Sequence, residues 1–289
     1  MSAPARLAIF SIGLLALALA AFAVGKQADV AAPGASAEPA AEHMGGMDAM
    51  EGAHEAHPVR GLGVAENGLR LQVADPELAR GATERLTFQI VGESGRPITE
   101  FDLTHTKRMH VIVVRRDLTG FQHLHPEMAA DGTWSVPLRL AEAGTYRVFA
   151  DFSHGGEAVT LADDLRVDGE ADLRALPAPA TRALGEPGGY AVDLRAGDSH
   201  AGDEASLRFS VTRAGEAAPL EPYLGAGGHL VALREGDLAF LHVHPTGDGG
   251  EDGSVEFEAT FPTAGRYRLF LQFVVDGELQ TVAFTEEVR

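Results

Sequence analysis

Apolar and polar residues alternate along short segments of this chain from residue 69 onward, and turn residues separate the segments. Alternation with a period of two predicts β-strands that each turn one face toward a core. In the first half, the predicted strands are 69–73, 86–91, 98–103, 109–114, 121–125, 133–138, 146–152 and 158–167. In the second half, they begin at Tyr190 and continue at 207–211, 230–233, 240–244, 255–261, 267–275 and 279–287. Seven or eight short strands in roughly 100 residues are typical of a β-sandwich, and neither half shows helical periodicity.

The two halves are copies of one another. Three histidines of the first half recur 119 positions later: His110, His123 and His125 return as His229, His242 and His244. Residues 143–149 return as 264–270 with a shift of 121 positions, which places a two-residue insertion in the acidic loop 246–253. The repeat therefore predicts an all-β chain of two tandem immunoglobulin-like β-sandwich domains.

We place the first sandwich at 63–170 and the second at 187–289, with a Pro- and Ala-rich linker at 171–186 between them. Residues 1–26 are predicted to form an N-terminal hydrophobic helix. An uncharged apolar run at 7–24 follows Arg6, and it is either a signal peptide with an Ala-Phe-Ala cleavage match or a membrane anchor long enough to span. In both cases the sandwiches are expected outside the cytoplasm, in the cell envelope or secreted.

The linker at 27–62 has too little bulky apolar content to pack. It contains a tract rich in methionine and histidine, formed by His43, Met44, Met47, Met50, His54 and His57. Thioethers suit Cu(I), while imidazole suits Cu(II) and Zn(II). The tract is therefore predicted to capture copper, and the alternative is a solvated low-complexity tether.

Each repeated histidine set lies on a predicted β-hairpin. Side chains at i and i+2 share one face of a strand, so His123 and His125 point the same way. With a turn at residues 118–119, Ile112 is expected opposite His125, and His110 lies one diagonal step away. The three imidazoles are thus predicted to converge on a metal at one end of the hairpin.

His229, His242 and His244 are expected to form the corresponding site of the second sandwich. Met128 is the predicted fourth ligand of the first site, and a set of histidine and methionine ligands favours copper, with zinc possible. The alternative is that the histidines are hydrogen-bonded interior residues.

Composition excludes several classes of function. A formal net charge of −19 argues against nucleic acid as a partner, because nucleic-acid binding depends on Lys and Arg. The sequence has no cysteine, so a metal would be held by His, Met, Asp or Glu. No nucleophile elbow, phosphate loop or His-Glu-x-x-His helix is present, and we therefore expect no enzyme activity.

Residues 107–110, 117–126, 132–134 and 143–152 carry a resemblance to known proteins. They resemble a group of bacterial exported or membrane-anchored proteins of unassigned role and, more loosely, the YtkA-like and CopC-like immunoglobulin-fold modules associated with copper. The resemblance implies a β-sandwich and extracytoplasmic copper.

The sequence thus predicts a non-catalytic metal-binding protein that captures or delivers copper at the cell envelope. Its expected partners are the metal ion, the membrane through the N-terminal helix, and an envelope protein that the sequence does not identify. The alternative function is a structural or protein-interaction module without a metal.

Overall fold

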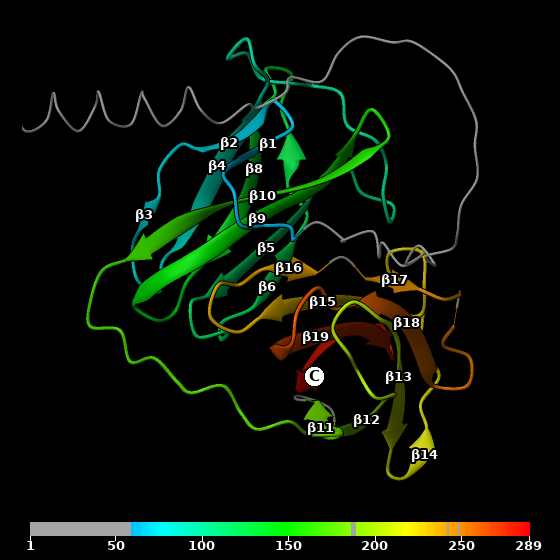
Figure 1. Cartoon of the computed structure of the whole chain (residues 1–289). Coiled ribbons are helices and arrows are strands. Elements are labelled where there is room, and N and C mark those ends of the chain that lie inside the picture. Colours follow the sequence, from blue (N-terminus) through cyan, green and yellow to red (C-terminus); the bar gives the residue numbers. More distant parts are fainter. Residues whose placement is uncertain (1–58, 186–188, 242, 248) are drawn as a thin grey trace, which may run out of the picture. The chain divides into compact units, whose positions relative to one another are not determined.

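A computed structural model describes residues 59–185, 189–241, 243–247 and 249–289, and it leaves the side chain of His244 undescribed (Figure 1). The predicted hydrophobic helix at 1–26 and the Met/His tract lie outside these residues, as does His242. Among the residues described, no helix has the length and apolar character needed to cross a membrane.

The first sandwich consists of two sheets of five strands each. One sheet has the order β1-β2-β4-β8-β7, with β1 at Ala65–Glu66, β2 at Leu69–Val73, β4 at Thr83–Val91, β8 at Trp134–Arg139 and β7 at Glu127–Met128. The other has the order β3-β10-β9-β5-β6, with β3 at Glu77–Leu78, β10 at Glu157–Val167, β9 at Gly144–His154, β5 at His110–Arg115 and β6 at Gln122–Leu124. All pairings are antiparallel except that of β3 with β10.

The second sandwich repeats this plan (Figure 1). One sheet has the order β11-β12-β13-β18-β17, with β11 at Arg182–Gly185, β12 at Tyr190–Ala196, β13 at Glu204–Arg213, β18 at Ser254–Thr260 and β17 at His244–Pro245; β14 at Glu216–Ala217 pairs with β13. The other has the order β16-β15-β19-β20, with β16 at Phe240–Leu241, β15 at His229–Arg234, β19 at Gly265–Val275 and β20 at Glu278–Val288. The expected all-β, duplicated architecture is confirmed.

The strand order is that of an immunoglobulin domain, in which strands A, B, E and D face strands C, F and G. In the first sandwich β2, β4, β8 and β7 form the first set, and β5, β9 and β10 form the second. A tyrosine at the start of strand F closes both domains. The hydroxyl of Tyr146 donates to the carbonyl of Glu142, and that of Tyr267 donates to the carbonyl of Thr263, each over 2.9 Å. This bond is the tyrosine corner of the immunoglobulin fold.

One predicted strand, at 98–103, is wrong. The amide of Ile98 donates to Ile90 on one sheet, whereas the amide of Asp102 donates to Ser153 on the other. The segment therefore crosses from sheet to sheet instead of joining either ladder. Phe101 anchors the crossing in the core, edge-on to Trp134 at 5.1 Å between ring centroids.

Alternate side chains along the C, F and G strands are buried in two different apolar cores. In β5, Val111 and Val113 point into the core of their own sandwich, while Ile112 and Val114 lie in a separate apolar cluster. That cluster, which we call the junction, also contains Val231, Leu233 and Phe270 of the second sandwich. The sheets that contain β5 and β15 therefore pack against each other through their outer faces.

The junction contacts are reciprocal between the two repeats. The ring of Phe121 stacks on Phe270 with centroids 4.1 Å apart, and Phe149 lies 5.5 Å from Phe240. Phe121 and Phe240 are equivalent positions of the repeat, and so are Phe149 and Phe270. The same pair of positions thus meets twice, as in a two-fold symmetric interface.

Candidate metal centre

The strand alternation that builds the junction also directs the histidines toward it. His110 begins β5 and shares a face with Ile112 and Val114, which lie in the junction. His229 begins β15 and shares a face with Val231 and Leu233, which lie there as well. The two repeated histidines are thus carried to the same side of the two packed sheets.

His123 is added by the hairpin partner of β5. In the ladder between β5 and β6, Ile112 pairs with His123 and Val111 pairs with Leu124. The expected pairing of Ile112 with His125 is therefore wrong by two residues, because the hairpin is centred between Asp117 and Leu118, one residue earlier than predicted. The observed register leaves His123 diagonal to His110, within reach of its ring.

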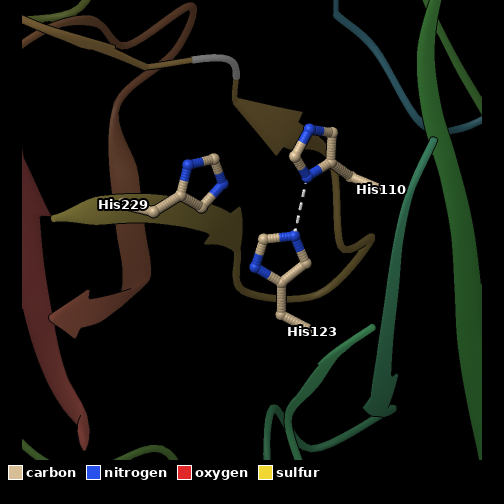
Figure 2. A group of neighbouring side chains, drawn as sticks. All are labelled: His110, His123 and His229. Atoms are coloured by element: carbon tan, nitrogen blue, oxygen red, sulfur yellow. Dashed lines mark hydrogen bonds between the residues drawn. The ribbon is translucent and has the colours of Figure 1, made fainter. Parts of the chain in front are cut away.

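Figure 2 shows how the three side chains meet. One ring nitrogen each of His110, His123 and His229 lies within 4.8 Å of the other two. His110 Nδ1 and His123 Nε2 are 3.0 Å apart. The rings of His110 and His229 are nearly parallel, with an interplanar angle of 6° and centroids 5.6 Å apart. Of the described side chains, these histidines form the one group whose geometry suits a metal ion.

With Gln272 Oε1 facing His123, two further hydrogen bonds assign the ring hydrogens of His110 and His123. His110 Nε2 lies 3.1 Å from the carbonyl oxygen of Thr104, which can only accept, so Nε2 is the donor. His123 Nδ1 lies 2.7 Å from Gln272 Oε1, which also only accepts, so Nδ1 is the donor. In neutral imidazoles the lone pairs are then on His110 Nδ1 and His123 Nε2, the two atoms that face each other.

With the hydrogens assigned in this way, both facing nitrogens present a lone pair, and a cation between them would bind both. Metal-bound histidines almost always donate their other N–H to a carbonyl or carboxylate, which orients the ring and fixes the tautomer. Thr104 and Gln272 occupy these two positions for His110 and His123. The Gln272 amide is held in turn, because its Nε2 donates to Thr281 Oγ1 over 3.2 Å.

The surroundings keep His123 and His125 neutral. Burial, together with the neighbouring His110, lowers the pKa of His123 to about 3 against the opposing effect of the Gln272 hydrogen bond. Burial likewise lowers the pKa of His125 to about 4, with contributions from His110 and Lys107. Neutral imidazole is the form that coordinates a metal, so these rings are in the required state at neutral pH.

A carboxylate lies beside the site. Asp151 on β9 is paired with His110 across the ladder, and burial raises the pKa of its carboxyl group. The hydroxyl of Thr160 donates to Asp151 over 2.7 Å. The equivalent position of the second sandwich, paired with His229, is Gln272. The 121-position shift of the repeat relates Asp151 to Gln272, whereas the pattern of histidines points to neither residue.

Two more histidines surround the trio. The ring centroid of His125 lies 4.7 Å from that of His123 and 5.1 Å from that of His110. Its Nε2 is buried with no hydrogen-bond partner among the residues described. His105 was not among the predicted ligands, although its ring lies 6.1 Å from His110 and 5.7 Å from His229. It is held by a tight turn in which Thr104 and Lys107 bridge, and this turn recurs at Tyr223 and Ala226.

The histidines are not divided by sandwich as expected. His229 was assigned to a separate site with His242 and His244, yet it joins the pair of the first sandwich because the two sheets pack face to face. His242 and the side chain of His244 lie outside the described part, as does the whole Met/His tract, His43, Met44, Met47, Met50, His54 and His57. Met128 lies in β7 and packs against the core of the first sandwich. The group in Figure 2 is therefore an all-nitrogen set.

Comparison with curated proteins gives no match. Solved structures similar to the chain include an alpha-2-macroglobulin of Salmonella, at 15% identity and a TM-score of 0.28 over 80% of this chain and 15% of that one. The Escherichia coli adhesin FdeC matches at 15% identity and a TM-score of 0.27, covering 78% and 65% of the two chains. The Yersinia pseudotuberculosis adhesin InvE matches at 12% identity and a TM-score of 0.23, covering 78% and 60%. The chain thus spans less than two thirds of the length of each, and at these TM-scores the superpositions add nothing to the strand order above.

A family model described as a domain of unknown function, DUF8832, matches the chain twice, at residues 64–169 and 185–289. The first match covers β1 to β10 of the first sandwich, and the second covers β12 to β20 of the second sandwich. The chain therefore belongs to the DUF8832 family and carries two tandem copies of its domain.

Proposed function

We propose that this protein is a non-catalytic metal-binding protein of the cell envelope, which captures or delivers a copper or zinc ion. One observation carries the proposal: His110, His123 and His229 direct ring nitrogens at one another while the outward nitrogens of His110 and His123 bond to acceptors. The proposed location rests on the apolar run at residues 7–24, which precedes the described residues.

The donor set fits such an ion. Two nitrogens at about 2.0 to 2.1 Å from a tetrahedral metal are roughly 3.3 Å apart, and His110 Nδ1 and His123 Nε2 are 3.0 Å apart. The third nitrogen, within 4.8 Å of the others, has to move closer. His229 is half-buried, whereas His110 and His123 are buried, so we expect its side chain to make the adjustment. Imidazole suits copper and zinc, and affinity for nitrogen sites among the divalent ions is highest for Cu(II).

The Met/His tract fits the same function as a second, flexible capture site for copper, with thioethers for Cu(I). Met128 as an additional ligand also stays a prediction. A metal ion is then the cargo of the protein, and the envelope partner that supplies or receives it is not identified by the chain.

A second function, a structural or interaction module without a metal, is favoured by one feature of the same network. If the Gln272 amide were rotated by 180°, its nitrogen would donate to His123 Nδ1, His123 Nε2 would donate to His110, and His110 would donate to Thr104. Every one of these bonds is then satisfied by neutral groups. In that case the histidines stabilise the junction, and the tandem sandwiches serve as a rigid module.

Calorimetric titration separates the two functions. The protein for this test is the full chain in which the six tract residues are replaced by alanine, His43, Met44, Met47, Met50, His54 and His57; we call it the tract-substituted chain. We expect one equivalent of Cu(II) or Zn(II) to bind, His123→Ala to abolish that binding, and His200→Ala, at an exposed position, to leave it intact. Absence of binding by Cu(II), Cu(I) and Zn(II) would support the structural module.

A further inference from the structure

The candidate site takes its parts from both sandwiches. His110 and His123 belong to the first, whereas His229 belongs to the second. The side chain that orients His123 also comes from the second sandwich, since Gln272 lies on β19. Among the residues described, neither sandwich alone supplies the three histidines of Figure 2 together with the Gln272 amide that bonds to His123.

Away from this polar end, the junction is mainly an apolar contact, with one hydrogen bond from the Arg116 side chain to the Gly236 carbonyl over 3.3 Å. Leu118 and Leu238 lie in the turns that follow β5 and β15, both with positive φ, near 62°. Both side chains are buried in the junction cluster. Each turn lies at the opposite end of its strand from the histidine, because His110 and His229 are the first residues of β5 and β15. The docking of the sandwiches therefore rests on two separate regions, an apolar one at the turns and a polar one at the histidines.

We propose, on the basis of the function proposed above, that a bound metal ion locks the two sandwiches against each other at this junction. A ligand that binds only the docked arrangement stabilises that arrangement by mass action. At a free metal concentration 100 times Kd, the ratio of docked to undocked molecules rises about 100-fold. The coupling is reciprocal, so a change that lowers the docked fraction lowers the apparent metal affinity in proportion to that fraction.

This reciprocity gives the first test, which uses Zn(II) and the tract-substituted chain. Leu238→Ala removes apolar contact from the junction without touching a histidine or Gln272. The apparent affinity falls in proportion to the docked fraction, and we expect a loss of severalfold. Leu118→Ala, the counterpart in the first sandwich, should act the same way and covers the case in which one variant does not fold. Leu279→Ala is the control, because this leucine of the second sandwich is 47% exposed.

The second test measures the junction itself. The natural chain has no cysteine, so Ser94→Cys and Glu216→Cys allow one spin label to be attached to an exposed site on each sandwich. Zn(II) is expected to narrow the distribution of label-to-label distances in the tract-substituted chain and with His200→Ala. With His229→Ala it should leave the distribution broad.

The outcomes distinguish the two proposals. Weaker zinc binding in the junction variants, with a narrower distance distribution on zinc addition, supports the lock. Zinc binding of unchanged affinity in folded Leu118→Ala and Leu238→Ala, with no change in the distance distribution, overturns the lock and leaves the metal function standing. No zinc binding by the tract-substituted chain overturns both.

Discussion

Replacing His123 by alanine should lower the unfolding free energy of the protein in two ways, one independent of metal and one dependent on it. Measurements with and without a chelator separate the two contributions. The His123 side chain is 8% exposed. It donates to Gln272 over 2.7 Å and lies 3.0 Å from His110 Nδ1. Losing a hydrogen bond costs about 0.5 to 1.5 kcal/mol, and leaving the buried amide oxygen unsatisfied costs about 1 to 3 kcal/mol. We therefore expect His123→Ala to lose about 1.5 to 4.5 kcal/mol of unfolding free energy without metal.

In the presence of metal, His123→Ala should also lose the stabilisation that the bound ion gives to the folded protein. An ion that binds only the folded protein stabilises it by about 2.7 kcal/mol at 100 times its Kd. The wild type gains this amount, and a variant that has lost the site does not. The difference in unfolding free energy between wild type and His123→Ala should therefore be larger by about 2.7 kcal/mol with zinc than with a chelator.

Denaturant unfolding of the tract-substituted chain, with and without His123→Ala, measures both amounts. His200→Ala serves as the control and should match its parent in zinc and in chelator alike. An equal destabilisation by His123→Ala under the two conditions would refute the metal interpretation, because the whole effect would then be structural.

Three further predictions follow from other parts of the molecule. Burial lowers the pKa of folded His123 from 6.5 to about 3, so the unfolded chain binds a proton at this residue at higher pH than the folded protein does. The metal-free unfolding free energy should therefore fall as pH drops below 6.5, by up to about 1.4 kcal/mol per pH unit. Denaturant unfolding at pH 7, 5.5 and 4.5 should show a smaller fall in His123→Ala. Tyr146→Phe and Tyr267→Phe each remove a corner hydrogen bond and should cost about 0.5 to 1.5 kcal/mol in unfolding free energy, and no loss in either would show that the corner does not stabilise the domain. Gly61→Ala should destabilise the protein by more than about 1 kcal/mol, since Gly61 has φ of 69° and an added Cβ would lie 2.7 Å from Phe240 Cβ; an unchanged melting temperature would contradict this packing.

The order and approximate positions of the strands could be predicted because the same pattern occurs in both halves of the sequence. Val111 and Val113 alternate with Ile112 and Val114, which indicates a strand but does not say that both faces are buried. A run of apolar residues without polar alternation is what a strand between two cores needs, and the second core was not recognisable until the junction was known. The segment at 98–103 was wrongly predicted as a strand. Phe101 is buried where the chain crosses between the sheets, and periodicity alone does not distinguish such a crossing from a strand.

The candidate site was predictable only in part for a related reason. The strand alternation correctly placed His123 and His125 on one side, and the structure brings both close to His110. The hairpin register depends on turn geometry, and the turn was predicted one residue too late in the chain. The approach of His229 depends on how the two domains pack against each other. The strand pattern of a single repeat does not indicate that packing.

The duplication also explains why a symmetric frame can hold an asymmetric site. Equivalent residues meet twice in the apolar part of the junction, as Phe121 with Phe270 and Phe149 with Phe240. At the histidine end the equivalent positions have diverged, since Asp151 faces His110 where Gln272 faces His229. An amide can accept from His123 without adding a charge to the junction, whereas a second buried carboxylate would have to be neutralised there. The apolar contacts thus follow the two-fold relation of the repeats, while Gln272, at the position equivalent to Asp151, is the residue that orients His123 of the other sandwich.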